Sequence, residues 1–365
     1  MEKKALGRET LEKYKELTLL YDLTEKLSEC LNPKEVAHLV IDEAKRLIRG
    51  DKIFVMLINE ETGLFDIFPA SGKDVGNMAV AGPLGVIPWN VINSGKAEIV
   101  NDVLSDSRYG SNFGKISSLM CSPLKIKDRV VGAITIISKK PVIYSAEELK
   151  LLSALSFQAA ADIENARLYD SLKETFLTTV RTLAETIEKR DPYTWGHTQR
   201  VTDYSIAIGS SLGLTEQEIE KLVLAAMLHD IGKIGIRDSI LLKKGKLTNE
   251  EFEEVKKHTI YAEEILEHIK HLKDIVPAVK HHHERYDGGG YPEKLKGDGI
   301  NIMARIIAIA DAFDAMTTDR PYRKRLLLDA ALEELKTNAG TQFDPEIVNA
   351  FFMAYENNNI MLKVD

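Results

Sequence analysis

The chain has 365 residues, 44% of them hydrophobic and 28% charged, with a formal net charge of −8. This length exceeds one ordinary hydrophobic core, so two domains of a globular protein are expected. The acidic balance argues against binding to a nucleic-acid duplex, which favours basic surfaces. No apolar run reaches the roughly 18 residues of a membrane-spanning helix, and the charged N-terminus lacks the apolar core of a signal peptide. The chain is therefore expected to be cytoplasmic, without a membrane span.

The first half of the chain predicts a compact α/β domain within residues 1–168. Residues 9–31 and 33–49 have the apolar spacing of amphipathic helices. The period then changes, and KIFVMLIN (52–59), LFDIFPA (64–70) and SPLKIKDRVVGAITIIS (122–138) read as strands between turn signals. Lys127-Asp128 separates two apolar runs as a hairpin tip would. We expect an antiparallel sheet with flanking helices.

A long helix is predicted over residues 145–190, which contain neither proline nor glycine. Its apolar residues follow a seven-residue repeat: Leu152, Leu155, Ala159, Ala166, Tyr169, Phe176, Val180, Leu183 and Ile187. Such a repeat without internal caps predicts a connecting helix that forms a coiled coil in a homodimer. The alternative is two successive helices, each packing on its own domain.

The second half predicts an all-α bundle over residues 172–365. After Asp191-Pro192 the apolar residues keep helical spacing, and no convincing alternating strand occurs. Thr215 with Glu218 and Thr248 with Glu251 have the spacing of capping boxes. The overall fold class is therefore α+β with more than one domain.

Histidine is concentrated in the second half, where eight of the nine lie after residue 190. The pairs His229-Asp230 and His282-His283 each close a helix with an apolar run, and Asp311 lies within the apolar stretch ARIIAIADAFDA. Burying such charges is costly unless something compensates them, and a metal ion is the simplest compensation. Any one of these residues alone fits an ordinary core or surface position. Together with two further histidines they form a candidate metal set: His197, His229, Asp230, His258, His282, His283 and Asp311.

The order of these residues is similar to the H…HD…D signature of the HD phosphohydrolase superfamily. The segments HDIGKIGIRDSILLKKGKLT, HHERYDGGGYP, ARIIAIADAFDAMTTDRPYR and AGTQFDPEIVNAF resemble the HD-GYP subfamily in the same order. The resemblance covers about residues 172–355. It implies metal-dependent hydrolysis of cyclic di-GMP to the linear dinucleotide pGpG, with onward cleavage to GMP left open. Two alternatives also stay open: another cyclic dinucleotide such as cyclic GMP-AMP, and a non-catalytic effector that binds nucleotide.

The resemblance also implies roles for individual residues. One metal would be held by His197, His229, Asp230 and Asp311. A second would be held by Asp230, His258, His282 and His283, with Asp230 bridging. The mixed imidazole and carboxylate set suits iron, manganese or zinc, and iron or manganese is expected here. Lys233, Arg320, Arg323 and Tyr291 would contact the substrate, and Glu284 and Arg285 would orient the histidines.

One position departs from a branch of that subfamily. Some members carry a glutamate four residues before the first histidine, as a ligand of a third metal, where this chain has Tyr193. A phenol with a pKa of about 10 is a poor substitute at neutral pH. Glu185 and Glu188 lie on the preceding helix, but a turn containing proline separates them from His197. Two divalent metals per domain are therefore expected.

Residues 20–168 resemble a GAF sensory domain, chiefly through SPLKIKDRVVGAITIIS and YSAEELKLLSALSFQAAADIENARLY. The resemblance implies a regulatory domain whose small-molecule ligand, if it binds one, is unknown. No motif for a chromophore, haem or iron–sulfur cluster is present in the sequence.

Overall fold

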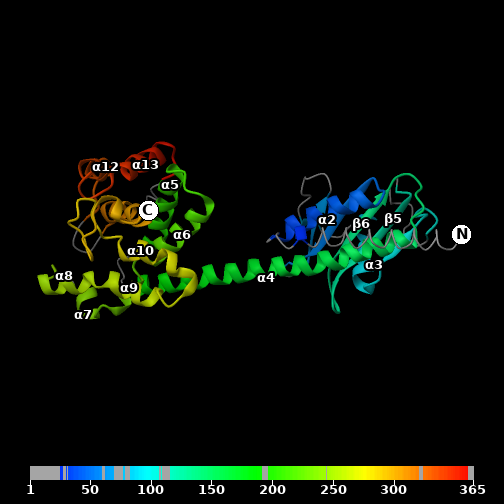
Figure 1. The fold of residues 1–365 in the computed structure, drawn as a ribbon, viewed down its shortest axis with the longest axis horizontal. Coiled ribbons are helices and arrows are strands. Elements are labelled where there is room, and N and C mark those ends of the chain that lie inside the picture. Colours follow the sequence, from blue (N-terminus) through cyan, green and yellow to red (C-terminus); the bar gives the residue numbers. More distant parts are fainter. Residues whose placement is uncertain are drawn as a thin grey trace, which may run out of the picture. The chain divides into compact units, whose positions relative to one another are not determined.

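The computed structural model describes residues 25–27, 30, 32–59, 62–69, 77–78, 83–106, 108, 116–190, 196–243, 245–319 and 324–360. The chain divides into two compact units, Met1–Glu174 and Thr175–Asp365. The first unit contains the β-sheet and the second is built from helices (Figure 1). The expected α+β organisation is confirmed.

An antiparallel sheet forms the centre of the first unit, with the strand order β3-β2-β1-β6-β5-β4. The strands are β1 (Lys52–Ile58), β2 (Phe65–Pro69), β3 (Asn77–Met78), β4 (Glu98–Val100), β5 (Ser118–Ile126) and β6 (Arg129–Ser138). Lys127, at the predicted tip between β5 and β6, has a φ of 53°. The hairpin expected at Lys127-Asp128 is therefore present.

Both faces of this sheet are covered by apolar side chains. Along β1, Val55 and Leu57 pack in a cluster with α2 (Pro33–Leu47) and the first part of α4, whereas Phe54 and Met56 pack in a second cluster with α3 (Pro83–Ser94). Alternate side chains of a strand point to opposite faces, so a strand buried on both sides reads as a continuous apolar run. KIFVMLIN is such a run.

Helix α4 (Ala146–Arg190) is unbroken over the predicted range. Leu152, Leu155, Ala159 and Ala166 of the predicted seam lie in the core of the first unit, and Val180 and Ile187 lie in the core of the second. These side chains are already covered by their own units and cannot line a seam between two copies. For these six side chains the predicted dimer seam is therefore wrong, and each packs on its own unit as in the alternative interpretation. Tyr169 and Leu183 of the same repeat are 47% and 49% exposed.

The second unit surrounds the buried helix α11 (Ile302–Thr317), whose two faces both contribute to the core. The long helices around it are α5 (His197–Ser211), α6 (Glu216–Leu228), α12 (Leu328–Thr337) and α13 (Pro345–Glu356). Shorter elements complete the unit: η1 (Ile231–Gly235), α7 (Asp238–Leu241), α8 (Asn249–Lys256), α9 (His258–Leu266), η2 (Lys270–Ile275), α10 (Val276–Lys280) and η3 (Gly297–Gly299). Both predicted capping boxes are formed, at Thr215 and Thr248. No helix in the described ranges is long and apolar enough to cross a membrane.

Candidate metal centre

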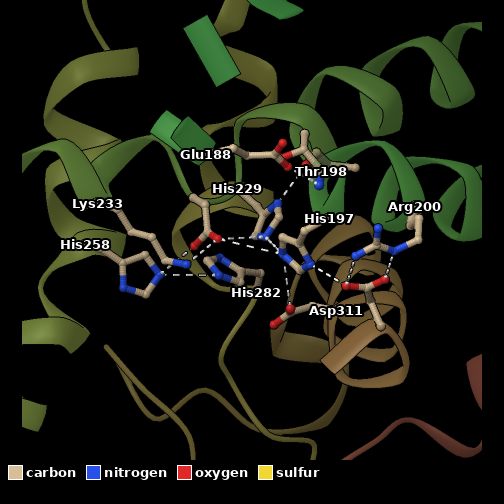
Figure 2. Close-up of polar contacts among 12 residues, drawn as sticks. Glu188, His197, Thr198, Arg200, His229, Lys233, His258, His282 and Asp311 are labelled. Atoms are coloured by element: carbon tan, nitrogen blue, oxygen red, sulfur yellow. Dashed lines mark hydrogen bonds and ion pairs between the residues drawn. The ribbon is translucent and has the colours of Figure 1, made fainter. Parts of the chain in front are cut away.

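The histidines and aspartates singled out in the sequence lie together in the second unit (Figure 2). Most occupy helix ends: His229 and Asp230 join α6 to η1, His258 begins α9, and His282 and His283 follow α10. His197 begins α5, and Asp311 projects from the middle of α11. Four helix ends and the middle of α11 therefore contribute side chains to one cluster.

Three of the imidazoles are oriented by the backbone. In each, Nδ1 lies within hydrogen-bond distance of the carbonyl oxygen three residues earlier in the chain. The pairs are His229 with Ala226 at 2.7 Å, His258 with Val255 at 2.7 Å and His282 with Val279 at 2.6 Å. An Nδ1–H that donates to a carbonyl leaves the Nε2 lone pair for a metal. The local chain therefore presents three ligand atoms of one kind.

His197 is oriented by a carboxylate instead. Its Nδ1 lies 2.7 Å from Oδ2 of Asp314, whose other oxygen accepts a hydrogen bond from Nε of Arg200 at 2.5 Å. Its Nε2 lies 3.5 Å from Asp311 and 3.3 Å from Nε2 of His229. The sequence analysis missed Asp314 and Arg200. A signal was available, because Asp314 follows Asp311 by one helical turn and so lies on the same face.

The ligand atoms group into three overlapping sets, and within each set they lie within 4.8 Å of one another. The sets are His197, His229 and Asp311; His229, Asp230 and His282; and His258, His282 and His283. Oδ2 of Asp230 lies 3.4 Å from His229, and its Oδ1 lies 3.7 Å from His258. Oδ2 also lies 3.8 Å from His197, so the two oxygens of one carboxylate face histidines of different ligand sets.

The charges of the cluster are compensated within it. Burial opposes ionisation of Asp230, but Lys233, with Nζ at 2.7 Å, and His229 outweigh it and hold the pKa of that carboxyl well below its usual range. Burial also opposes the charged form of His229, yet Asp230 raises its pKa to about 9. Burial lowers the pKa of His283 to about 3 and that of His282 well below its usual value. These two imidazoles are neutral and ready to bind a cation.

Helix α5 carries His197 and is capped by a residue from α4. Gly196 has a φ of 70° and makes no side-chain cap. The carboxylate of Glu188 accepts hydrogen bonds from the backbone N–H of Gly196 at 3.2 Å and of Thr198 at 2.5 Å. Glu188 therefore lies against the backbone on both sides of His197 and is not separated from it as expected.

The Gly-Tyr-Pro loop covers one side of the histidines. The Tyr291 ring lies 4.9 Å from that of His283, centroid to centroid, and burial raises the pKa of its phenol, which stays neutral. A Cβ on Gly290 would lie 2.3 Å from the backbone nitrogen of Arg285, so only glycine allows this approach. Glu284 accepts from the N–H of Glu293.

The expectation that Glu284 and Arg285 orient the histidines is not met by the hydrogen bonds observed. Arg285 pairs with Asp287 and Gln342, and Glu284 holds the N–H of Glu293. Both residues brace the loop that carries Tyr291. Arg320, Arg323 and Tyr193 lie outside the described residues.

Comparison with protein-family models gives one match in each unit. A GAF domain model matches residues 30–164, and an HD domain model matches residues 181–347. The HD match contains all seven candidate metal ligands.

Curated relatives match the second half of the chain. The chain is 41% identical over 197 residues to the cyclic di-GMP phosphodiesterase response regulator RpfG of Xanthomonas campestris pv. campestris, covering 53% of this chain and 52% of that protein. It is 37% identical to the 3'3'-cGAMP-specific phosphodiesterase 3 of Vibrio cholerae, covering 52% and 41%. It is 45% identical to a cyclic di-GMP phosphodiesterase of Thermotoga maritima, covering 45% of each. The chain thus spans about half the length of the curated relatives it matches.

Proposed function

The chain contains a GAF domain and an HD domain, and from that premise we propose that its helical unit is a metal-dependent phosphodiesterase of cyclic di-GMP. The observation that carries the proposal is the chain of three ligand sets, which share His229 and His282, with Asp230 in the middle set. A buried cluster of imidazoles and carboxylates with perturbed pKa values is typical of a catalytic site. The names of the relatives supply the substrate class.

The residues present fit two divalent ions. His197, His229, Asp230 and Asp311 would hold one ion, and Asp230, His258, His282 and His283 the other. The fit rests on the backbone contacts that leave Nε2 of His229, His258 and His282 available, and on the two directions that the Asp230 oxygens face. Imidazole with carboxylate favours iron or manganese over magnesium or calcium. Two such ions would activate a water molecule and neutralise phosphate oxygens.

The remaining groups bind and orient the substrate. Lys233 now pairs with Asp230; when cations neutralise that carboxylate, its ammonium group would contact a non-bridging phosphate oxygen. The neutral phenol of Tyr291 would cover the other side of the phosphate. Arg320 and Arg323 would supply guanidinium groups for phosphate or guanine edges. The product would be pGpG, since two metals leave fewer cations to hold the linear dinucleotide for cleavage to GMP.

Incubation of the full chain with manganese or iron(II) and each cyclic dinucleotide, followed by chromatography and mass spectrometry, tests the proposal. We expect linear pGpG from cyclic di-GMP. The second candidate substrate is 3'3'-cGAMP, for which three of the relatives are named. Cleavage of 3'3'-cGAMP alone would replace cyclic di-GMP as the proposed substrate. Binding of either nucleotide without cleavage would indicate the non-catalytic effector.

Lys233→Ala is expected to lower kcat for cyclic di-GMP by about 10²–10³-fold, because it removes one preorganised charge from a reacting phosphate. The metal content should not change, since Lys233 is not a ligand. Steady-state kinetics and elemental analysis measure the two quantities. Lys221→Ala, which breaks only an exposed pair with Asp274, is the matched control. An unchanged kcat would remove Lys233 from the mechanism.

We further propose a homodimer through a face of α4 other than the predicted seam. Phe157, Leu168 and Leu172 are 68%, 61% and 69% exposed. Their spacings of eleven and four residues place them on one side of a helix. We expect light scattering at micromolar concentration to give a dimer for the wild type and a monomer for a Leu168→Glu, Leu172→Glu double variant. Leu104→Glu, at an apolar residue 73% exposed elsewhere in the unit, should remain dimeric. A monomeric wild type would contradict the interface.

The GAF domain is proposed to regulate hydrolysis by binding a small molecule. Its sheet is covered on both faces by apolar side chains among the described residues.

A further inference from the structure

We propose that Arg190, the last residue of α4, is a positioning residue for Lys233. The inference rests on the proposed function, in which the Lys233 ammonium group contacts the reacting phosphate. Arg190 does not touch Lys233's side chain. It acts on the backbone of the segment that carries it, η1 and the two residues that follow.

Every N–H of the Arg190 guanidinium has an acceptor. Nη1 donates to the carbonyl oxygens of Lys233 at 3.2 Å and Ile234 at 2.6 Å, and Nη2 donates to that of Ile236 at 2.7 Å. Nε and Nη2 both reach Oδ1 of Asp238, at 2.9 and 2.7 Å. A guanidinium has five N–H groups in a fixed plane, so this contact uses all of them. The Arg190 fork therefore holds three backbone carbonyls and one side-chain carboxylate between residues 233 and 238 at once.

The carbonyl oxygens of Ile234 and Ile236 lie at the end of the short helix η1 and just beyond it, where carbonyl oxygens lack intrahelical N–H donors. The carbonyl oxygen of Lys233 also accepts the backbone N–H of Ile236, at 3.1 Å. A lysine could not replace the fork, because an ammonium group is a point charge with three donors and cannot span three carbonyls and a carboxylate.

The first part of η1 is fixed by close packing. A Cβ on Gly232 would lie 1.8 Å from the carbonyl oxygen of His258, so this residue abuts the start of α9. The backbone before Lys233 is thus held by packing, and the backbone after it is held by Arg190. The position of Nζ, 2.7 Å from Asp230, depends on both supports.

The last turn of α4 also reaches the other side of the metal centre. Glu188 accepts the N–H groups of Gly196 and Thr198, on either side of His197 (Figure 2). A displacement of this turn would therefore move Lys233 through Arg190 and His197 through Glu188. A regulatory input carried by α4 would act on the site at these two residues.

The test compares Arg190→Lys with Arg237→Lys. Arg237 lies in the same segment and makes a two-bond pair with Glu254, but its side chain is 67% exposed. We expect R190K to lower kcat for cyclic di-GMP by about 10²-fold, with its bound metal unchanged. R237K should retain the wild-type kcat. Adding R190K to Lys233→Ala should cause no further loss, since the group it positions is gone. An R190K variant as active as R237K, or losses that multiply in the double variant, would overturn the proposal.

Hydrogen exchange of residues 231–238 separates this inference from the proposed function. R190K should exchange faster there than the wild type and R237K, whichever substrate the enzyme cleaves. If the wild type cleaves no cyclic dinucleotide, the proposed function fails, and the exchange data still decide whether Arg190 holds the segment. Unchanged exchange would refute the positioning role.

Discussion

Asp230→Ala is expected to abolish both metal binding and hydrolysis. The Asp230 carboxylate lies within 4 Å of His197, His229, His258 and Lys233, so it lies between the two proposed metal sites. Removing a residue that only orients a ligand typically costs about 10–100-fold in affinity or activity. Loss of a shared ligand should cost more than that. Both proposed ions would lose a bond, and no carboxylate would remain between their two positive charges.

Elemental analysis and turnover of cyclic di-GMP check this result. The matched control is Asp274→Ala, which removes an exposed aspartate paired with Lys221 and should keep full metal content. Circular dichroism measures the helix content of Asp230→Ala. We expect it to match that of the wild type, because only one buried carboxylate and the metals are lost. A variant that keeps both its metals and its kcat would show that the ligand assignment is wrong.

Gly232→Ala is expected to destabilise the second unit and to displace a metal ligand. The added Cβ would lie 1.8 Å from the carbonyl oxygen of His258 and 2.6 Å from the backbone nitrogen of Ala262. Neither atom belongs to a flexible side chain, so η1 and α9 must move apart. Overpacking of this kind costs about 1–3 kcal/mol or more, and His258 would move away from Asp230.

The midpoint of urea unfolding and the metal content measure the two effects of Gly232→Ala. Gly299→Ala is the control, because a Cβ there meets nothing within 4 Å. It should shift the midpoint little, and any shift would be towards higher stability, since alanine restricts the unfolded chain. Equal midpoints for the two variants would contradict the close approach of η1 to α9.

Local signals in the sequence predicted the local structure well. The capping boxes at Thr215 and Thr248 depend on residues three apart, and both form. The unbroken α4 follows from the absence of proline and glycine over its length. The coiled-coil seam was assigned wrongly because a periodic apolar face shows that a helix is covered but does not show what covers it. For Leu155 and Ile187 the cover is the core of the residue's own unit.

The metal-ligand candidates could be predicted from the sequence for a similar reason. A charged pair such as His229-Asp230 at the end of an apolar helix needs a partner wherever that helix packs. The residues that position His197 and the Lys233 segment were not predicted from the sequence. Asp314 contacts His197 from 117 positions away in the chain, and Arg190 reaches the Lys233 segment from 43 positions away. Such contacts are set by tertiary packing. Asp314 carried a local signal in its spacing of one turn from Asp311, whereas Arg190 carried none.

The central claim is that the cluster around Asp230 binds two metals and that hydrolysis depends on them. The most direct test strips the full chain with a chelator, adds back manganese or iron(II) in measured equivalents, and follows bound metal and turnover of cyclic di-GMP together. We predict no turnover in the stripped protein, and turnover that rises to a plateau at about two bound ions per chain. Full turnover without bound metal would contradict the account, and a third tightly bound ion would contradict the expected count.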